Sequence, residues 1–209
     1  MTTDSSTYHR RVAAEKRSAI IEAATRLFLE ASYDGISLAR IAEEAGVSKA
    51  TLFKQFPTKA VLFEAIVTES WNVDDKDVQP QPGDLRAGLT AIGHRYAALL
   101  TRPGMAGLFR IVIAELPRFP ELGETQFQLG KMPYFDSVRR YLEAENAAGT
   151  ARLDDSVMAA TQFLGMISNY VFWPRMLLLN WNPKAADTQN AVEEAVVTML
   201  ARYGVANGD

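Results

Sequence analysis

The sequence predicts an all-α protein, and three observations support this prediction. Apolar residues recur every three or four positions in almost every segment of the 209-residue chain, which is the spacing of one helix face. The strict alternation of apolar and polar residues that marks a half-buried strand is absent. Serine, glycine and proline stand where these segments begin and end. With 48% hydrophobic and 22% charged residues, the chain has the composition of a folded globular protein.

The first helix is predicted from an apolar stripe near the N-terminus. Its members lie on one helical face: Ile20, Ala24, Leu27 and Ala31, with Phe28 beside them. We expect this helix to begin between Arg10 and Lys16 and to end before the turn residues Asp34-Gly35.

Two short helices joined by a tight turn follow. Ser37 is a candidate N-cap for a helix over 38–45, and Gly46 is placed to end it in the left-handed conformation. Ser48 is a candidate N-cap for the next helix, 49–56, so the turn has about three residues, as in a helix-turn-helix. The residues expected to hold the pair to the core are Leu38, Ile41, Ala42, Ala45, Val47, Leu52 and Phe56.

A connecting helix is expected over 58–72, after Pro57. Thr58 is placed to cap it, and Leu62, Phe63, Ile66 and Val67 mark its buried face. Residues 72–83, with three aspartates and two prolines, have the composition of a loop. We therefore divide the chain into an N-terminal domain, 1–57, and a larger C-terminal domain, 58–209, that begins with the connecting helix.

The C-terminal domain is expected to be helical throughout. The predicted segments are 84–101, 103–116, 120–129, 133–147, 154–179 and 185–203. Pro174 is expected to kink or end the long helix 154–179, because proline lacks the N–H that the helix needs.

The charge distribution favours local binding of nucleic acid. A net charge of −3 argues against a protein that coats DNA with its whole surface. From Lys49 to Lys59, however, no acidic residue occurs. Because the second helix of a helix-turn-helix lies in the major groove, this stretch is the candidate DNA-facing surface.

The segment IAEEAGVSKATLFKQFPTKAVLFEAI, from Ile41 to Ile66, resembles the DNA-binding signature of the TetR family. The resemblance implies a three-helix DNA-binding head that binds double-stranded operator DNA, and a larger helical domain for ligand binding and dimerisation. It also implies transcription regulation, usually as a repressor, rather than catalysis.

The resemblance suggests a role for each residue of the head. Lys54 and Lys59 would pair with phosphates, and Ser37, Ser48 and Thr51 would bond the DNA backbone. Lys49, Thr51 and Arg40 are the candidates for reaching base edges. Three positions depart from the family pattern: Ala50, Phe53 and Gln55. Phe53 lacks a hydroxyl for a phosphate but can still pack on a sugar or a thymine methyl, and Gln55 retains donors that could read adenine. Ser37, Ser48 and Thr58 would serve as helix caps even without DNA.

The second domain carries a weaker resemblance. RIVIAELPRFPELG, from Arg110 to Gly123, is similar to the AefR-like branch of the family. In this family the last two helices of each subunit form a four-helix dimer interface, which implies a homodimer. The residues expected there are Val157, Ala160, Leu164, Val192, Ala195, Val196, Met199 and Leu200.

A further set of residues could line a site for a small apolar or amphipathic effector, although ordinary core packing explains each of them singly. The set is His94, Phe109, Tyr134, Phe163, Met166, Asn169, Tyr170 and Trp173. The expected mechanism is release of a palindromic operator when the effector binds.

Two other classes of function are open alternatives. A helical ligand-binding protein without DNA binding would lack salt-sensitive operator binding. An enzyme has less support, because His9 and His94 are the only histidines and no G-x-S-x-G turn or phosphate-binding glycine loop occurs. We expect no cofactor and no metal, and the absence of cysteine excludes thiolate sites. Without a signal peptide or an apolar stretch of about 20 residues, we expect a cytoplasmic protein that does not contact a membrane.

Overall fold

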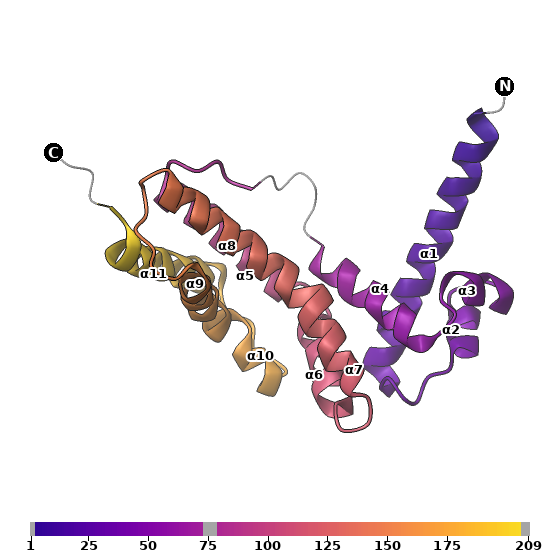
Figure 1. Ribbon diagram of the computed structural model, residues 1–209. Helices are drawn as coiled ribbons and strands as arrows, with labels where there is room; N and C mark the ends of the chain where they lie inside the picture. The colour runs from indigo at the N-terminus through magenta and orange to yellow at the C-terminus, as the bar shows by residue number, and fades with distance from the viewer. Residues whose placement is uncertain (1–2, 73–78, 206–209) are drawn as a thin grey trace. The chain divides into compact units, whose positions relative to one another are not determined.

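A computed structural model describes residues 3–72 and 79–205 (Figure 1). The predicted all-α class is confirmed: in the described residues the only β feature is an isolated bridge between Ala151 and Gly204. The helices are α1 (Thr3–Ala31), α2 (Leu38–Glu44), α3 (Lys49–Gln55), α4 (Lys59–Trp71), α5 (Leu85–Thr101), α6 (Met105–Glu115), α7 (Pro120–Thr125), the π-helix η1 (Gln126–Lys131), α8 (Met132–Ala147), α9 (Ser156–Val171), α10 (Trp173–Leu177) and α11 (Ala185–Tyr203). Residues 73–78 of the expected loop lie outside the described residues.

The chain forms two compact units. The first contains the residues up to Ser70 together with Gly107–Leu129, and the second contains Trp71–Ala106 and the residues from Gly130 onward. Most of α6, all of α7 and the start of η1 therefore pack with α1 to α4. These units divide the chain by packing, whereas the expected boundary after residue 57 divides it by function, so that boundary stays a prediction.

The core of the first unit is built from the apolar stripes seen in the sequence. Ile20, Ala24, Leu27 and Phe28 of α1 are buried, as expected, whereas Ala31, the last residue of the helix, is exposed. So are the four residues that mark the inner face of α4: Leu62, Phe63, Ile66 and Val67. An aromatic contact joins these helices, because the Tyr33 ring lies 5.2 Å from Phe28 and 5.7 Å from Phe63 between ring centroids.

The expected start of α1 is wrong: the helix begins at Thr3 rather than between Arg10 and Lys16. Side chains from Thr7 to Ser18 are exposed, apart from the half-buried Val12. The apolar stripe begins only at Ile20, and it marks burial rather than the start of the helix. The residues from Arg10 to Ala19 include three alanines, three arginines, one lysine and one glutamate, which form helix readily with little burial.

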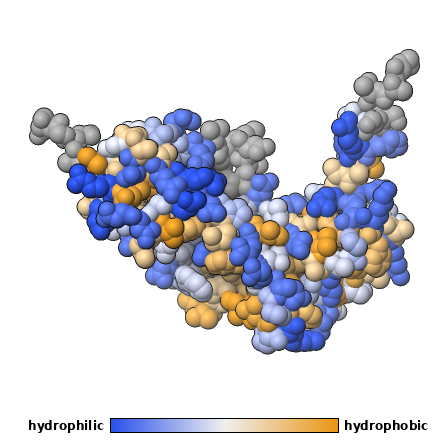
Figure 2. Space-filling view, in the orientation of Figure 1, coloured by the Kyte–Doolittle hydropathy of each residue, from blue (hydrophilic) through white to orange (hydrophobic). Residues whose placement is uncertain are grey.

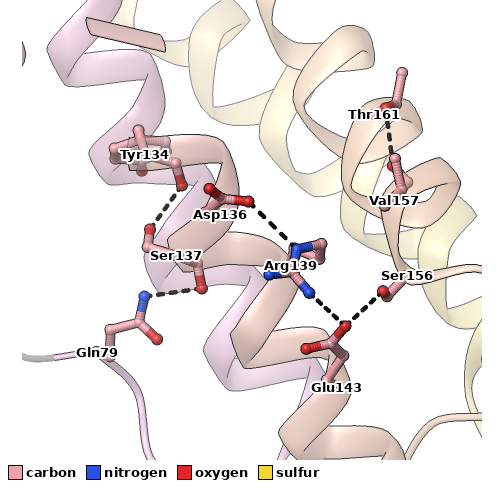
Figure 3. A network of polar contacts seen from close by, with 9 residues as sticks. All are labelled: Gln79, Tyr134, Asp136, Ser137, Arg139, Glu143, Ser156, Val157 and Thr161. Atoms are coloured by element: carbon pink, nitrogen blue, oxygen red, sulfur yellow. Dashed lines mark hydrogen bonds and ion pairs between the residues drawn. The ribbon is translucent and has the colours of Figure 1, made fainter. Parts of the chain in front are cut away.

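The second unit is a bundle in which α5, α8, α9 and α11 pack on one another. Its largest fully buried side chains include Leu89, Tyr141 and Phe163. Figure 3 shows a polar network on this bundle: Glu143 of α8 accepts hydrogen bonds from Arg139 (2.7 Å) and from Ser156 (2.8 Å) at the start of α9. The Ser156 hydrogen bond, followed by Arg139, holds the pKa of Glu143 below its ordinary value.

Two helix boundaries in the second half differ from those expected. The expected helix 154–179 is divided into α9 and α10, which meet at Phe172. Pro174 accounts for this break, because its ring and its missing N–H prevent α9 from continuing. The expected helices 120–129 and 133–147 instead follow each other without a loop, through η1. Pro133 lies in the first turn of α8, directly after η1.

The expected dimer-facing stripe on α9 and α11 is wrong in most of its members. Six of the eight side chains are buried within the single chain: Ala160, Leu164, Val192, Ala195, Val196 and Met199. Leu200 is half-buried, and only Val157 is exposed (52%). The stripe packs inside the bundle, because α9 and α11 contact each other and α5 in the same subunit.

Among the described residues, no single helix is both long and apolar enough to cross a membrane, and α5 and α6 meet that criterion only as a bent pair.

Candidate DNA-binding interface

The α2–turn–α3 segment is held by local hydrogen bonds that its sequence predicts. The Ser37 hydroxyl accepts a hydrogen bond from the Arg40 N–H (3.2 Å), and the Ser48 hydroxyl accepts one from the Thr51 N–H (3.1 Å). Gly46 ends α2 with φ 65°, a left-handed conformation that suits glycine. The Val47 N–H then donates to the Ala42 carbonyl (3.0 Å), which closes the turn. The predicted caps and turn are confirmed.

The α3 helix has one buried face and one exposed face. Leu52 and Phe56 are fully buried, as expected, so the helix is fixed to the core of the first unit. Four side chains on the other side are exposed: Lys49, Ala50, Phe53 and Lys54. Thr51 and Gln55 are half-buried at the margins of this face. The exposed face combines two cations with one aromatic ring, and it can meet phosphates and base edges.

Arg40 and Thr51 are engaged within the protein. The Arg40 guanidinium forms ion pairs with Glu43 (2.9 Å) and Glu44 (3.2 Å), and the Glu43 hydrogen bond is the largest cause of its raised pKa. The Thr51 hydroxyl lies 2.8 Å from the Ser48 hydroxyl. Arg40 is exposed, and exposed ion pairs are weak, so phosphate or base can compete with these carboxylates.

Lys59 does not belong to the exposed face of α3, because it contacts the connection after α1. Its ammonium group donates hydrogen bonds to the carbonyls of Tyr33 (2.9 Å) and Asp34 (3.2 Å) and lies 5.0 Å from the centre of the Tyr33 ring. Burial is the largest cause that lowers its pKa. Lys59 therefore fastens α4 to the connection after α1, and an ammonium group has only one further N–H for the phosphate contact expected from the sequence.

Four basic residues of the first half of α1 were not among the predicted DNA contacts: Arg10, Arg11, Lys16 and Arg17, all exposed. This half of α1 extends beyond α2 and α3 within the first unit (Figure 1), and its visible surface is mainly hydrophilic (Figure 2). Arg17 lies over the ring of Phe56, at the end of α3, with its guanidinium carbon 4.6 Å from the ring centre. The run of basic residues before the apolar stripe could have indicated this surface in the sequence. The predicted helix began too late to place the whole run on α1.

Two sequence profiles match the chain. One, described as bacterial regulatory proteins of the tetR family, matches residues 20–66. The other, described as the AefR-like transcriptional repressor C-terminal domain, matches residues 87–205, which is more than half of the chain. The chain belongs to the TetR family. It is therefore a DNA-binding transcriptional regulator with a helix-turn-helix, and not an enzyme.

Relatives and solved structures agree with this assignment. An uncharacterized HTH-type transcriptional regulator of Mycobacterium tuberculosis is 23% identical over 190 residues, which are 90% of this chain and 89% of the relative. A TetR-family regulator from Mesorhizobium loti has a TM-score of 0.80 at 28% identity, covering 92% of this chain and 98% of its own. A protein named Flavonoid-responsive Regulator FrrA has a TM-score of 0.74 at 28% identity, covering 92% and 99%.

In this TetR-family regulator, the junction between α6 and α7 contacts the connection after α1. Arg118 forms an ion pair with Asp34 (2.7 Å), and Glu115 accepts a hydrogen bond from the Asp34 N–H (3.4 Å). The Phe119 ring lies 5.2 Å from the Tyr33 ring between centroids. Tyr33 is therefore enclosed, and burial, followed by Glu121 and Glu115, raises its pKa to about 12.

The residues expected to line a ligand site differ in their exposure, and their role stays a prediction. His94, Asn169, Tyr170 and Trp173 are exposed, Phe109, Tyr134 and Met166 are half-buried, and Phe163 is core. Tyr134 stacks on Tyr96, with centroids 5.2 Å apart, and Tyr170 meets Trp181 edge to face at 6.3 Å. Through residues 3–72 and 79–205, no group of three or more His, Cys, Asp or Glu is arranged to hold a metal ion.

Proposed function

We propose that this regulator is a homodimeric repressor that binds a two-fold-related operator and leaves it when a small effector binds. The observation that carries the proposal is the exposed face of α3, which lies on a rigidly capped helix in a stretch free of acidic residues. The AefR-like repressor profile over residues 87–205 supports repression rather than activation.

In the proposed complex, α3 enters the major groove. Lys54 pairs with a phosphate, Lys49 and Thr51 reach base edges, and the exposed ring of Phe53 packs on a sugar or a thymine methyl. Gln55 and Arg40 contact DNA from the margins of the face, and Ser37 and Ser48 contribute backbone contacts in addition to their capping. Lys59 uses its remaining N–H for a phosphate.

The first half of α1 adds a second contact in this proposal. Its arginines and lysine are exposed, and Arg17 reaches the end of α3 by lying over the Phe56 ring. Because cations on a helix bind the DNA backbone whatever the base sequence, α1 contributes affinity rather than specificity.

Homodimerisation is proposed through the exposed sides of α9 and α11 rather than the buried stripe. Met158 and Val157 of α9 and Val197 of α11 are large apolar side chains with exposures of 50%, 52% and 42%. Gly165 leaves open space at the surface of α9, so a partner helix can approach closely. Exposed apolar residues of α10 and the segment after it, including Leu177 (87%) and Leu179 (82%), extend the apolar surface, and hydrophobic colour is visible there in Figure 2.

The proposed effector is small and amphipathic, and a flavonoid is the first compound to test. The support comes from the name of a solved relative, the flavonoid-responsive regulator FrrA, which matches this chain over 92% of its length at 28% identity. Effector binding is proposed to shift α4. Since Lys59 joins α4 to Tyr33 and Asp34, such a shift would change the separation of the two heads relative to the spacing of about 34 Å between successive major grooves.

The decisive experiment captures genomic DNA fragments on the purified protein and sequences them. We expect enrichment of a two-fold-related site, with binding that weakens steeply as salt rises. Lys54→Ala should weaken binding to all sequences and reduce the salt slope by about 0.9 for each phosphate contact removed, whereas Lys184→Ala, an exposed lysine in the second unit, should not. If no fragment binds better than random DNA at moderate salt, the proposed binding of a two-fold-related operator is wrong.

A further inference from the structure

The π-helix η1 places a buried amide where an apolar side chain would be expected. Gln126, its first residue, is 4% exposed, whereas Phe127 and Leu129 are 45% and 44% exposed and Gln128 is also exposed. The polar amide is thus buried, while its two large apolar neighbours are exposed. π-helical turns are rare and often occur at functional sites, because the extra residue widens the helix and changes which side chains point inward.

The side chain of Gln126 has unmet hydrogen-bonding capacity. Both of its polar atoms, Nε2 and Oε1, are buried, and within the described part of the chain neither has a hydrogen-bond partner. Its backbone N–H is engaged with the carbonyls of Leu122 and Gly123, so only the amide group is available. A buried amide without partners destabilises a folded protein, and such groups are retained where something else gains from them.

The chain position of Gln126 connects it to the DNA-binding head. Residues 107–129 belong to the same compact unit as α1 to α4. Directly before η1, α7 begins at Pro120, next to the Arg118 and Phe119 side chains that hold Asp34 and Tyr33. A group bound at Gln126 would therefore act on a segment that is fixed to the connection between α1 and α2.

We propose that Gln126 is the hydrogen-bonding anchor of the effector, and that the effector presents a neutral group that both donates and accepts. This inference rests on the proposed function and deepens it. An amide carries no charge, and its oxygen accepts while its NH₂ donates. It therefore suits a hydroxyl beside a carbonyl, as in a hydroxylated flavonoid, better than a carboxylate or an ammonium ion. The anchor lies in the first unit, whereas seven of the eight residues selected from the sequence lie in the second.

The test compares Gln126→Met, which keeps the length of the side chain and removes its polar atoms, with Gln128→Met, the same change on an exposed residue of η1. In the absence of effector, Gln126→Met should raise the melting temperature by about 2–4 °C, because a buried unsatisfied amide is replaced by an apolar group. Gln128→Met should leave it unchanged. A lower melting temperature for Gln126→Met would show that the amide has a structural partner, and it would overturn the proposal.

The second measurement uses naringenin, a flavanone with a hydroxyl beside its ketone, as the probe. Isothermal titration should show binding to the wild type and to Gln128→Met, and at least about tenfold weaker binding to Gln126→Met. Equal affinity for the wild type and Gln126→Met, or no binding to the wild type, would overturn the assignment of this ligand class to Gln126. Operator capture without effector separates the two proposals. The wild type, Gln126→Met and Gln128→Met should all bind the operator. Failure of the wild type to bind it would contradict the proposed function rather than the role of Gln126.

Discussion

At the scale of single residues, a buried carboxylate organises one end of the second unit. Glu145 is fully buried and accepts hydrogen bonds from the hydroxyls of Tyr141 and Thr150 and from the Gly83 N–H (3.0 Å). A buried carboxylate needs such donors to replace water. These bonds join Gly83, just before α5, to the end of α8. They also hold the Tyr141 hydroxyl close against Gly88 of α5.

Gly88→Ala should destabilise the protein by about 1–3 kcal/mol. A Cβ at this position would lie 1.6 Å from the Tyr141 hydroxyl oxygen, so the tyrosine would have to leave Glu145. Urea denaturation of the whole protein measures the effect. The control is Ala91→Ser, a similarly small change on an exposed residue of the same helix. Equal stability of the two variants would contradict the packing at Gly88.

The stability of the protein should fall between about pH 10 and pH 12. Burial raises the pKa of Tyr33 and of Tyr96 to about 12 from 10.0. Because the folded state holds these protons more tightly, their contribution is fully present below pH 10 and is lost as pH rises through 12. Tyr33→Phe and Tyr96→Phe should each flatten the loss of melting temperature over this interval, whereas Tyr8→Phe, an exposed tyrosine, should not. Identical profiles for all four proteins would be inconsistent with burial of these phenols.

At the scale of elements, α3 is a short helix whose position depends on its two ends. Ser48 caps its beginning and Phe56, fully buried, fixes its end. Seven residues are too few for a stable isolated helix, so capping and burial supply the order that length does not. The same serine is a candidate DNA contact, and its two roles can be separated by substitution.

Ser48→Ala should lower stability by about 1 kcal/mol, because the Thr51 N–H loses its acceptor. Ser48→Asp should keep the cap and the stability, since aspartate is an equally good N-cap, yet it should weaken operator binding by placing a negative charge beside phosphates. Thermal melting and fluorescence anisotropy on the captured operator distinguish the two effects. If Ser48→Asp binds operator as tightly as the wild type does, α3 does not face DNA at this end.

At the scale of the whole molecule, the proposed binding of a two-fold-related operator requires two heads at a fixed separation, which one chain does not supply. The exposed sides of α9 and α11 are the proposed contact, and the closely packed sides of the same helices form the core of each subunit. A dimer would therefore rest on two folded bundles rather than exchange their cores.

Val197→Glu should convert the dimer into monomer, because it places a charge in the middle of the proposed apolar contact. Analytical ultracentrifugation measures the assembly. Operator affinity should fall by about 100-fold or more, since the two heads lose the advantage of their linkage. The control is Ile113→Glu, which charges a residue of α6 in the first unit that is exposed to 52%, against 42% for Val197. A stable Val197→Glu dimer would place the interface elsewhere.

Much of the DNA-binding head could be predicted from the sequence alone. The caps Ser37 and Ser48, the turn at Gly46 and the buried face of α3 depend on neighbours within about four residues, so local chemistry determined them. The resemblance of the head to the TetR family likewise lay in one continuous segment, Ile41 to Ile66. The break near Pro174 was also local, because a missing N–H acts on the preceding turn.

Only the tertiary structure decided which of two apolar faces each later helix buries. Periodicity identified stripes on α9 and α11 but did not reveal that the chain itself covers them. The tertiary structure also decided that Lys59 bonds Tyr33 and Asp34, that residues 107–129 pack with the head, and that Gln126 is buried. The physical reason is the same in each case: the partners are far away in the sequence, and burial is a property of the surroundings of a side chain rather than of its spacing.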